Sequence, residues 1–397
     1  MTPLITTHFE NKDLDIRKKF PGYSRFMDQK VTPDVLAFIA DCVLNLPDSE
    51  SFTVRDIWES DYFEKNTKAI FGKPAPSNDS AFSEYNKFIG QPLKTLAYAQ
   101  VLNERKDGNT NRYTINNKEL LEYISLNERG ALDFICMYLV KVLTDSGFYS
   151  HFETYRDQVR GNSDSSNFDT FKQRFQRFMR GNTEINGVTE INRIFPKVLN
   201  PLAVKENIPG SEKGHMTKHP FMFSELMYNR TNFRDLKKAK GISRQEATEL
   251  ASERKQKEDF AEYRITKAMQ LIKRKYTSSE VRDKWADGPA TYVHHIFPRA
   301  KYPEYAAHTE NLIKLTAEQH YGHAHPSART QEVNRDYQIQ CLLAKYDSIE
   351  QSLRDGEFIY SKDSFISMIN ACLGVKIDMQ SSFDELRQAL VNFQTKA

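Results

Sequence analysis

The stretch "TYVHHIFPRAKYPEYAAHTENLIKLTAEQHYGHAHP", from Thr291 to Pro326, holds six of the ten histidines in the chain. Its first part is rich in β-branched and aromatic residues and predicts a short strand, and "NLIKL" (311–315) predicts a second one. Thr316 and Gln319 have the spacing of a capping box, so a helix should begin near Ala317. The expected order is therefore strand, loop, strand and helix, with His320 in the first turn of the helix, facing the strands.

The two adjacent histidines of the first strand, His294 and His295, must have different roles. Neighbouring residues of a strand point to opposite faces, so one ring can face the helix and a metal ion while the other faces a substrate. Hydrolysis of a phosphodiester needs a divalent ion, a base of near-neutral pKa and a group that orients the base. Histidine can serve as ligand or as base, and an asparagine carbonyl can fix the orientation of its ring.

This pattern resembles the HNH motif, the ββα-metal finger of colicin DNases, homing endonucleases and many restriction enzymes. His294-His295, Asn311 and His320 fill its places, and the spacing from Asn311 to His320 (320 − 311 = 9) matches the colicin-like arrangement. The resemblance implies that His294 and His320 are metal ligands, His295 is the general base and Asn311 orients it. More faintly, "VLNPLA" and "ELMYNRTNFRD" resemble HNH restriction endonucleases of bacterial defence systems.

A third imidazole ligand is expected from His323 or His325, and spacing does not decide between them. His323 follows His320 by three residues on the same helical face, and His325 stands before Pro326, where the helix must end. The expected cofactor is one divalent ion per site, with Mg²⁺ first and Mn²⁺, Ni²⁺ or Zn²⁺ as alternatives. The finger lacks the cysteine pairs that hold a structural zinc, so packing against its neighbours must support it.

The N-terminal part predicts three helices followed by a hairpin. Thr32-Pro33 begins the first helix, Thr53 and Asp56 form a capping box for the second, and "SAFSEYNKFIG" (80–90) is the third, ending around Gly90 and Pro92. Two strand-like runs, "LAYAQVLNER" and "RYTI", surround the turn at 107–109. This order favours a winged helix-turn-helix that binds DNA over a small α+β domain for protein contacts. The candidate DNA-binding residues are Lys87, Arg105, Lys106 and Arg112.

The expected fold is mainly α with small β elements. "ALDFICMYLVKVL" (131–143) predicts a buried connecting helix, 160–169 a linker, and 243–276 one polar helix or two. We expect five segments: a winged-helix-like domain over 1–125, a connecting helix and linker over 126–160, a helical, basic middle region with DNA contacts over 161–285, the finger over 286–330 and a helical C-terminal region over 331–397. Apolar residues at 337–353 and 363–373 favour equally a homodimer surface and support for the finger.

Composition narrows the class of protein. No run of apolar residues is long enough to span a membrane, and the N-terminus lacks a signal peptide, so a cytoplasmic protein of bacterial type is expected. The cysteines, Cys42, Cys136, Cys341 and Cys372, form no CxxC pair. No GxxxxGK[ST] motif is present, so no nucleotide cofactor is expected. A net charge of +3 does not by itself indicate a nucleic-acid binder.

These features together favour a metal-dependent, sequence-specific endonuclease of the type II restriction kind, with double-stranded DNA as its substrate. One alternative is an endonuclease that depends on DNA methylation. Another is a DNA-binding regulator without enzymatic activity, in which the histidines hold a structural metal ion.

Overall fold

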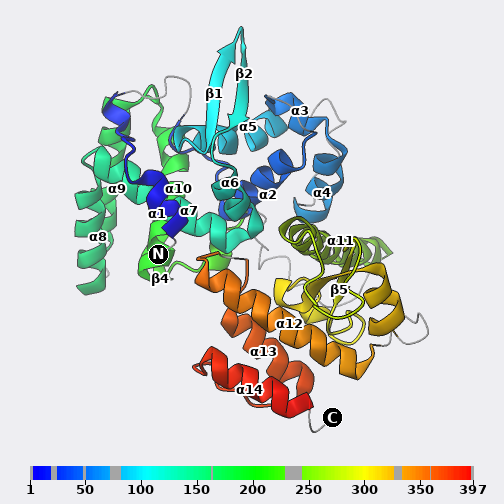
Figure 1. Ribbon diagram of the computed structural model, residues 1–397. Coiled ribbons are helices and arrows are strands. Elements are labelled where there is room, and N and C mark those ends of the chain that lie inside the picture. Colours follow the sequence, from blue (N-terminus) through cyan, green and yellow to red (C-terminus); the bar gives the residue numbers. More distant parts are fainter. Residues whose placement is uncertain are drawn as a thin grey trace. The chain divides into compact units, whose positions relative to one another are not determined.

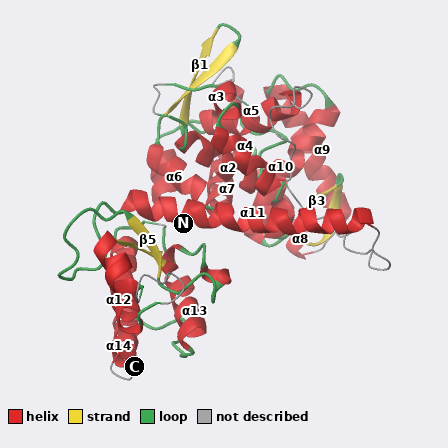
Figure 2. Cartoon of the chain, turned by 90° about the vertical axis from the view of Figure 1, so that its right-hand side faces the viewer, coloured by secondary structure: helices red, strands yellow, loops and turns green. Residues whose placement is uncertain are grey.

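The computed structural model of this chain divides it into two compact units, Met1–Gln245 and Glu246–Ala397. Both consist mainly of helices with small antiparallel sheets, which confirms the expected mainly α class (Figures 1 and 2). Within the described ranges no helix combines the length and the apolar character needed to cross a membrane. The structure describes residues 3–18, 25–47, 51–71, 82–161, 164–228, 244–325, 333–357 and 359–394.

The first unit is a helical assembly that carries two β-hairpins. Helix α2 lies against both α6 and α7, and α10 lies against α7 and β3, so residues predicted as separate segments pack together. The boundaries expected within each unit remain predictions. The elements of the first unit are α1 (Pro3–Phe9), α2 (Pro33–Leu44), α3 (Val54–Trp58), α4 (Asp61–Phe71), α5 (Phe82–Tyr98), β1 (Leu102–Asp107), β2 (Thr110–Ile115), α6 (Lys118–Leu126), α7 (Glu128–Asp145), α8 (Tyr149–Gly161), α9 (Ser165–Asn182), α10 (Val188–Glu206), β3 (Pro209–Glu212) and β4 (His215–Pro220), with short 3₁₀ turns at Ile16–Lys18 and Phe223–Leu226.

The first two predicted helices are present with the expected starts. Helix α2 begins at Pro33, where the fixed φ of proline suits the first helical position. Helix α3 begins with a complete capping box, in which the Thr53 side chain accepts from the backbone of Asp56 and the Asp56 carboxylate accepts from the backbone of Thr53. Helix α4, which was not predicted, follows directly. Helix α7 is the predicted buried helix, and ten of its residues are buried.

The predicted end of the third helix at Gly90 and Pro92 is wrong. Helix α5 continues through both residues to Tyr98, so "LAY" at its end is helical and the first strand begins only at Leu102. A proline inside a helix removes one hydrogen bond and costs about 3 kcal/mol. Four fully buried side chains lie around it, and the burial of this apolar face offsets that cost; they are Phe88, Ile89, Leu93 and Leu96.

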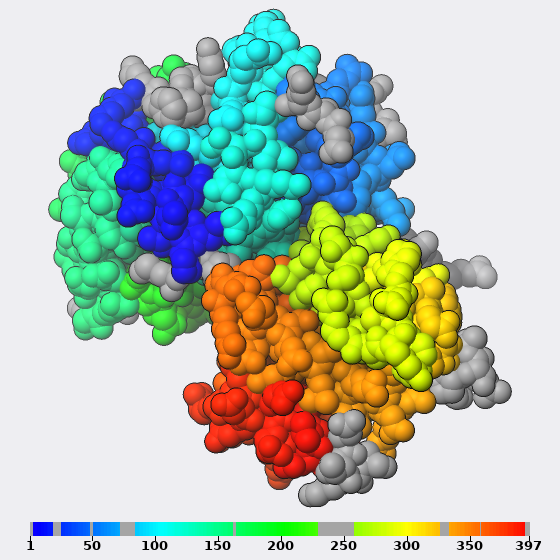
Figure 3. Space-filling view, in the orientation of Figure 1, coloured from blue at the N-terminus to red at the C-terminus, as the bar shows by residue number. Residues whose placement is uncertain are grey.

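Strands β1 and β2 form the predicted hairpin, which projects from the helices of the first unit (Figure 3, cyan). Its turn contains Gly108, whose positive φ of 59° is a conformation that glycine adopts readily. In the register of the hairpin, Arg105 stands directly opposite Arg112. The winged-helix interpretation of this region stays a prediction.

Most of the predicted linker at 160–169 is helical, and residues 162–163 lie outside the described ranges. Helix α8 continues to Gly161 and α9 begins at Ser165, with the Asp164 side chain accepting from the backbone of Ser166 as the N-cap. Capping by aspartate explains why a polar, serine-rich stretch begins a helix here. The β3–β4 hairpin was not predicted either.

The second unit contains the histidine-rich stretch. Its long polar segment is one helix, as one of the two alternatives expected. Strands β5 and β6 appear at the predicted places, and the predicted helix near Ala317 is a π-helix, η7. The elements are α11 (Arg244–Lys275), β5 (Tyr292–His295), β6 (Leu312–Leu315), η7 (Glu318–Ala324), α12 (Arg335–Arg354), α13 (Lys362–Leu373) and α14 (Phe383–Gln394), with 3₁₀ turns at Pro303–Tyr305 and Thr309–Asn311.

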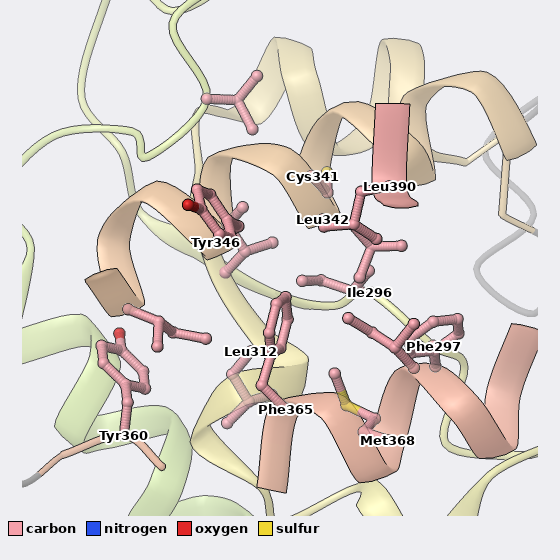
Figure 4. Close-up of a cluster of buried hydrophobic side chains, with 14 of the residues drawn as sticks. Ile296, Phe297, Leu312, Cys341, Leu342, Tyr346, Tyr360, Phe365, Met368 and Leu390 are labelled. Carbon is pink, nitrogen blue, oxygen red and sulfur yellow. The ribbon is translucent and has the colours of Figure 1, made fainter. Parts of the chain in front are cut away.

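The apolar residues of α12 and α13 form the core that supports the finger. Leu312 of β6 and Ile296, next to β5, are fully buried in the same cluster as Cys341 and Leu342 of α12 and Phe365 of α13 (Figure 4). Of the two alternatives for 337–353 and 363–373, this packing favours support for the finger, because most of the apolar side chains lie in or against the core. A homodimer stays a prediction. All four cysteines are free thiols, so packing takes the place of metal-binding cysteines in holding the finger.

A buried ion pair lies beside this core. Lys345 of α12 donates to Glu280 at 2.6 Å, and their side chains are 0% and 1% exposed. The other carboxylate oxygen of Glu280 accepts from the backbone of Lys314 in β6. The Lys314 ammonium in turn donates to the backbone carbonyls of Lys273 and Tyr276, at the end of α11. These bonds connect β6 to both α11 and α12.

Candidate metal centre

Strands β5 and β6 place the two adjacent histidines on opposite faces. The strands are antiparallel, with His294 opposite Ile313 and His295 opposite Leu312. His294 is 3% exposed and lies against the rings of His320 and His325, whereas His295 is half-buried and bonds to the loop that follows β5. The alternation of the strand thus gives the two rings separate surroundings, as the sequence predicts.

The start of η7 is fixed by the predicted capping box. The Gln319 side chain accepts from the backbone of Thr316, and the Thr316 hydroxyl accepts from the backbone of Gln319. Gln319 is fully buried, and its amide also donates to the carbonyl of Val281 and to Asp283. This network holds the first turn of η7, and with it His320, against the segment that precedes β5.

His325, and not His323, is the third member of the group. It follows the last residue of η7, and its backbone is extended, with φ −115° and ψ 110°, so the chain has left the helical turn at this residue. His320 and His325 are five apart (325 − 320 = 5), and the structure brings them together with His294. Ligand nitrogens of these three residues all lie within 4.8 Å of one another. The choice between His323 and His325 is thereby made in favour of His325.

The three imidazole rings stand nearly at right angles to one another. Their centroids are 5.3 Å apart for His294 and His320, and 4.8 Å apart for each of the other two pairs. The interplanar angles are 76° to 80°. Such a three-sided arrangement turns ring nitrogens toward a common point, which suits a single ion rather than a stack of packed rings.

His323 has a different environment. Its ring stacks on that of Trp285, with centroids 3.5 Å apart and an interplanar angle of 24°, and its Nε2 lies 3.7 Å from Glu318. The His323 side chain therefore packs against Trp285 and Tyr337 and does not belong to the three-histidine group.

The protonation of the group suits metal binding. Burial lowers the pKa of His294 well below its ordinary value, and the neighbouring imidazoles lower it further. Burial also lowers the pKa of His320, to about 4, with His325 adding to the effect. Both rings are therefore neutral at neutral pH, the form in which imidazole binds a metal.

The residues present fit a metal ion. Among the described residues, Nε2 of His294 and Nδ1 of His320 are buried polar atoms without a hydrogen-bond partner, an arrangement that costs free energy unless a ligand satisfies them. The nitrogens all lie within 4.8 Å of one another, and the ligands of a tetrahedral zinc ion are separated by about 3.4 Å. A set of three imidazoles favours Zn²⁺ or Ni²⁺ over Mg²⁺ and Mn²⁺, which prefer oxygen ligands. The first expected ion therefore changes from Mg²⁺ to Zn²⁺ or Ni²⁺.

His295 is oriented by a backbone carbonyl. Its Nε2 lies 2.9 Å from the carbonyl oxygen of Ala306. Because a carbonyl only accepts, Nε2 carries the proton and Nδ1 keeps a free electron pair. Burial lowers the pKa of His295, while its bond to Ala306 raises it in part. The ring is thus neutral and has one nitrogen ready to accept a proton.

Asn311 acts on the loop and not directly on His295. Its side chain is fully buried, accepts from the backbone of Phe297 at 2.8 Å, and donates to the carbonyls of Phe297 and Tyr305 at 3.1 Å. Tyr305 precedes Ala306, so these bonds fix the loop that presents the Ala306 carbonyl. The expected contact between Asn311 and the base is corrected to this indirect one, because the amide is used up by the backbone on both sides of the loop.

A pocket of about 550 Å³ opens beside the three histidines. His294, His295, His320 and His325 line it together, and Arg299 does so as well. Sequence reasoning missed Arg299 and the Ala306 carbonyl. Nothing in the sequence could identify a carbonyl, and Arg299 differs from other surface arginines only in following the first strand closely.

The candidate DNA-binding residues lie in the first unit. Lys87 is exposed on α5, Arg105 and Lys106 are exposed on β1, and Arg112 is half-buried on β2, where it pairs with Asp107 at 2.8 Å. Three of the four are therefore on one hairpin. Within the middle region predicted to contact DNA (161–285), residues 229–243, which include a basic run, lie outside the described residues.

Comparisons of the chain with protein-family models, with curated proteins and with solved structures found no match.

Proposed function

We propose that this chain is a metal-dependent endonuclease that hydrolyses phosphodiester bonds in double-stranded DNA with a single-metal HNH-type site. The observation that carries the proposal is the convergence of His294, His320 and His325 on one side of a pocket that His295 also lines. A pair of antiparallel strands followed by a helical turn holds all four residues, in the order that the HNH motif has. Among the described residues, His294, His320 and His325 are the one group of three or more His, Cys, Asp or Glu side chains that could hold a metal ion.

In the proposed reaction the metal ion and the side chains of the chain have separate chemical roles. His294, His320 and His325 hold the ion, which when bound polarises the phosphate and stabilises the leaving oxygen. His295 accepts a proton from water at Nδ1, because Nε2 is occupied by the Ala306 carbonyl. The water oxygen forms a bond to phosphorus and one P–O ester bond breaks. Asn311 keeps the loop, and hence the ring of His295, in place.

An open pocket favours a catalytic role over a structural one. Structural zinc ions are four-coordinate and enclosed by protein ligands, whereas catalytic zinc has three protein ligands and one open position. Three imidazoles beside a pocket match the second arrangement. A regulator with a structural metal would also have no use for His295.

For recognition of DNA we propose the β1–β2 hairpin together with α5. Arg105 and Arg112 are directly opposite each other in the register. Asp107 pairs with Arg112 and offsets part of the repulsion between these like charges, and phosphate groups beside them would relieve the rest. Together with Lys87 and Lys106 they form the candidate contact, as expected for a winged-helix module.

The test is incubation of the purified chain with plasmid DNA, methylated and unmethylated, in the presence of Mg²⁺, Mn²⁺, Ni²⁺ or Zn²⁺. We expect discrete fragments that disappear with a chelator and in His294→Ala. His308→Ala is the matched control, since His308 lies in the same stretch and does not line the pocket. Fragments from methylated plasmid alone would select the modification-dependent alternative. DNA that is bound and never cut with any of the four ions would contradict the proposal and favour the regulator.

A further inference from the structure

The pocket beside the three histidines has an uneven charge. Among its described lining residues Arg299 is the one permanent cation, and no carboxylate is present. The three imidazoles are neutral ligands, so they leave the charge of a bound divalent ion uncompensated. An ion on one side and a guanidinium on the other make the pocket suited to an anion.

Arg299 has an internal partner on a neighbouring helix. Its Nη2 lies 2.6 Å from Oε2 of Glu262 in α11, and the two side chains are 50% and 56% exposed. Ion pairs with this exposure are screened by water and salt and contribute little to stability. The guanidinium can therefore exchange its carboxylate for another anion with little loss.

We propose that Arg299 is the phosphate-binding residue of this pocket, and that Glu262 is the carboxylate it exchanges for the phosphodiester. The planar fork of arginine fits carboxylate and phosphate oxygens in the same two-pronged way, so one group can replace the other without rearrangement of the guanidinium. Glu262 then competes with the substrate for Arg299 and lowers the affinity of the pocket. The identity of the anion as a phosphodiester rests on the function proposed above.

The inference is tested on the full-length chain loaded with Zn²⁺, with bis(p-nitrophenyl) phosphate as the probe and calorimetry as the readout. We expect Arg299→Ala to weaken binding about 10- to 100-fold, the usual range for hydrogen bonds to a charged group. Arg299→Lys should restore part of the affinity, because it keeps the charge and loses the fork. Glu262→Gln should tighten binding by about two- to fivefold.

The double variant gives the decisive comparison. If Glu262 acts through Arg299, Glu262→Gln changes nothing in a chain that already carries Arg299→Ala. Glu59→Gln is the matched control: Glu59 pairs with Arg55 at 2.6 Å and is exposed to a similar degree, at 58%. Unchanged affinity in Arg299→Ala, or an equal gain from Glu262→Gln with and without Arg299, would overturn the proposal.

Binding and cleavage separate this inference from the proposed function. A chain that binds the probe through Arg299 and never hydrolyses it, or DNA, supports the phosphate site while the nuclease function fails. A chain that cleaves DNA with the same rate and the same affinity for the probe in Arg299→Ala keeps the function and overturns the inference. The metal content of each variant, measured beside the calorimetry, shows whether the three-histidine group is intact.

Discussion

At the scale of single residues, the histidines show which members of the site can be predicted from their spacing in the sequence. Four of the residues named from the pattern, His294, His295, Asn311 and His320, lie together around one pocket or its supporting loop. Spacing of three residues suggests a shared face for His320 and His323, but only if the helix is α-helical. The turn is instead π-helical and ends at Ala324, and His325, the extended residue that follows it, joins the group. Neither the type of the turn nor the backbone conformation at its end is visible in the sequence.

The assignment of His325 leads to a direct prediction. His325→Ala should lower the affinity for Zn²⁺ or Co²⁺ by more than the roughly 10- to 100-fold that the loss of an outer-shell partner costs. His323→Ala is the matched comparison and should leave metal affinity unchanged, although loss of the stack on Trp285 should lower the stability of the chain. Competition with a chromophoric chelator measures both. Equal losses in the two variants would contradict the assignment.

The lowered pKa values of the buried histidines predict how stability depends on pH. In the unfolded chain histidine titrates near 6.5, whereas the folded pKa of His320 is about 4 and that of His294 is also lowered. Between these values the unfolded chain binds more protons than the folded one, so the free energy of unfolding rises with pH. We expect the metal-free protein to lose stability as pH falls from about 6.5 toward about 4. Urea unfolding at several pH values checks this, and His320→Leu should flatten the dependence.

At the scale of elements, the helix starts and turns that depend on short-range contacts between side chains and backbone were predicted correctly. The capping boxes of α3 and η7, the proline at the start of α2 and the hairpin turn at Gly108 all depend on contacts within a few residues. The errors have the opposite cause. Helix α5 passes through Pro92 because a buried apolar face outweighs the missing bond, and burial of that kind depends on distant residues.

The buried ion pair of Lys345 and Glu280, which connects α12 to β6, is the contact that we expect to contribute most to the stability of the finger. Lys345→Met leaves the carboxylate of Glu280 buried without its cation and should destabilise the chain by about 3–5 kcal/mol. Adding Glu280→Gln removes the buried charge and keeps an acceptor for the backbone of Lys314, so most of the loss should be recovered. The denaturant midpoints of the single and the double variant, compared with that of the wild type, measure the loss and the recovery of stability. A double variant as unstable as Lys345→Met alone would show that the charge is not the cause.

The hairpin is the element that we expect to bind DNA. Replacing Arg105 and Lys106 by alanine should weaken binding of duplex DNA and lower the salt slope by about one for each phosphate group that the variant no longer neutralises. Arg112 is left in place because it pairs with Asp107, and its replacement would also break that ion pair. Fluorescence anisotropy at several salt concentrations measures the slope. An unchanged slope would place recognition outside the hairpin.

At the scale of the whole molecule, the sequence predicts the secondary-structure class of the fold better than the division of the chain into compact units. The mainly α class with small antiparallel sheets is confirmed. The two units, however, join residues that pattern alone separates, because α2 contacts α7 and α10 contacts α7 across long stretches of chain. The apolar excess of α12 and α13 is explained in the same way, as the core of the second unit. The homodimer that 337–353 and 363–373 also allow stays a prediction, which light scattering with and without DNA tests.

The central claim is that one pocket holds a metal ion and a proton acceptor with separate roles. The most direct test measures DNA cleavage and metal affinity side by side in His295→Ala. We predict that cleavage falls by roughly 10²–10⁴-fold, the usual effect of removing a general base, while the affinity for the ion is unchanged. Cleavage within about tenfold of the wild-type rate would contradict the role of His295, given that range. A matching loss of metal affinity would contradict the separation of ligand and base.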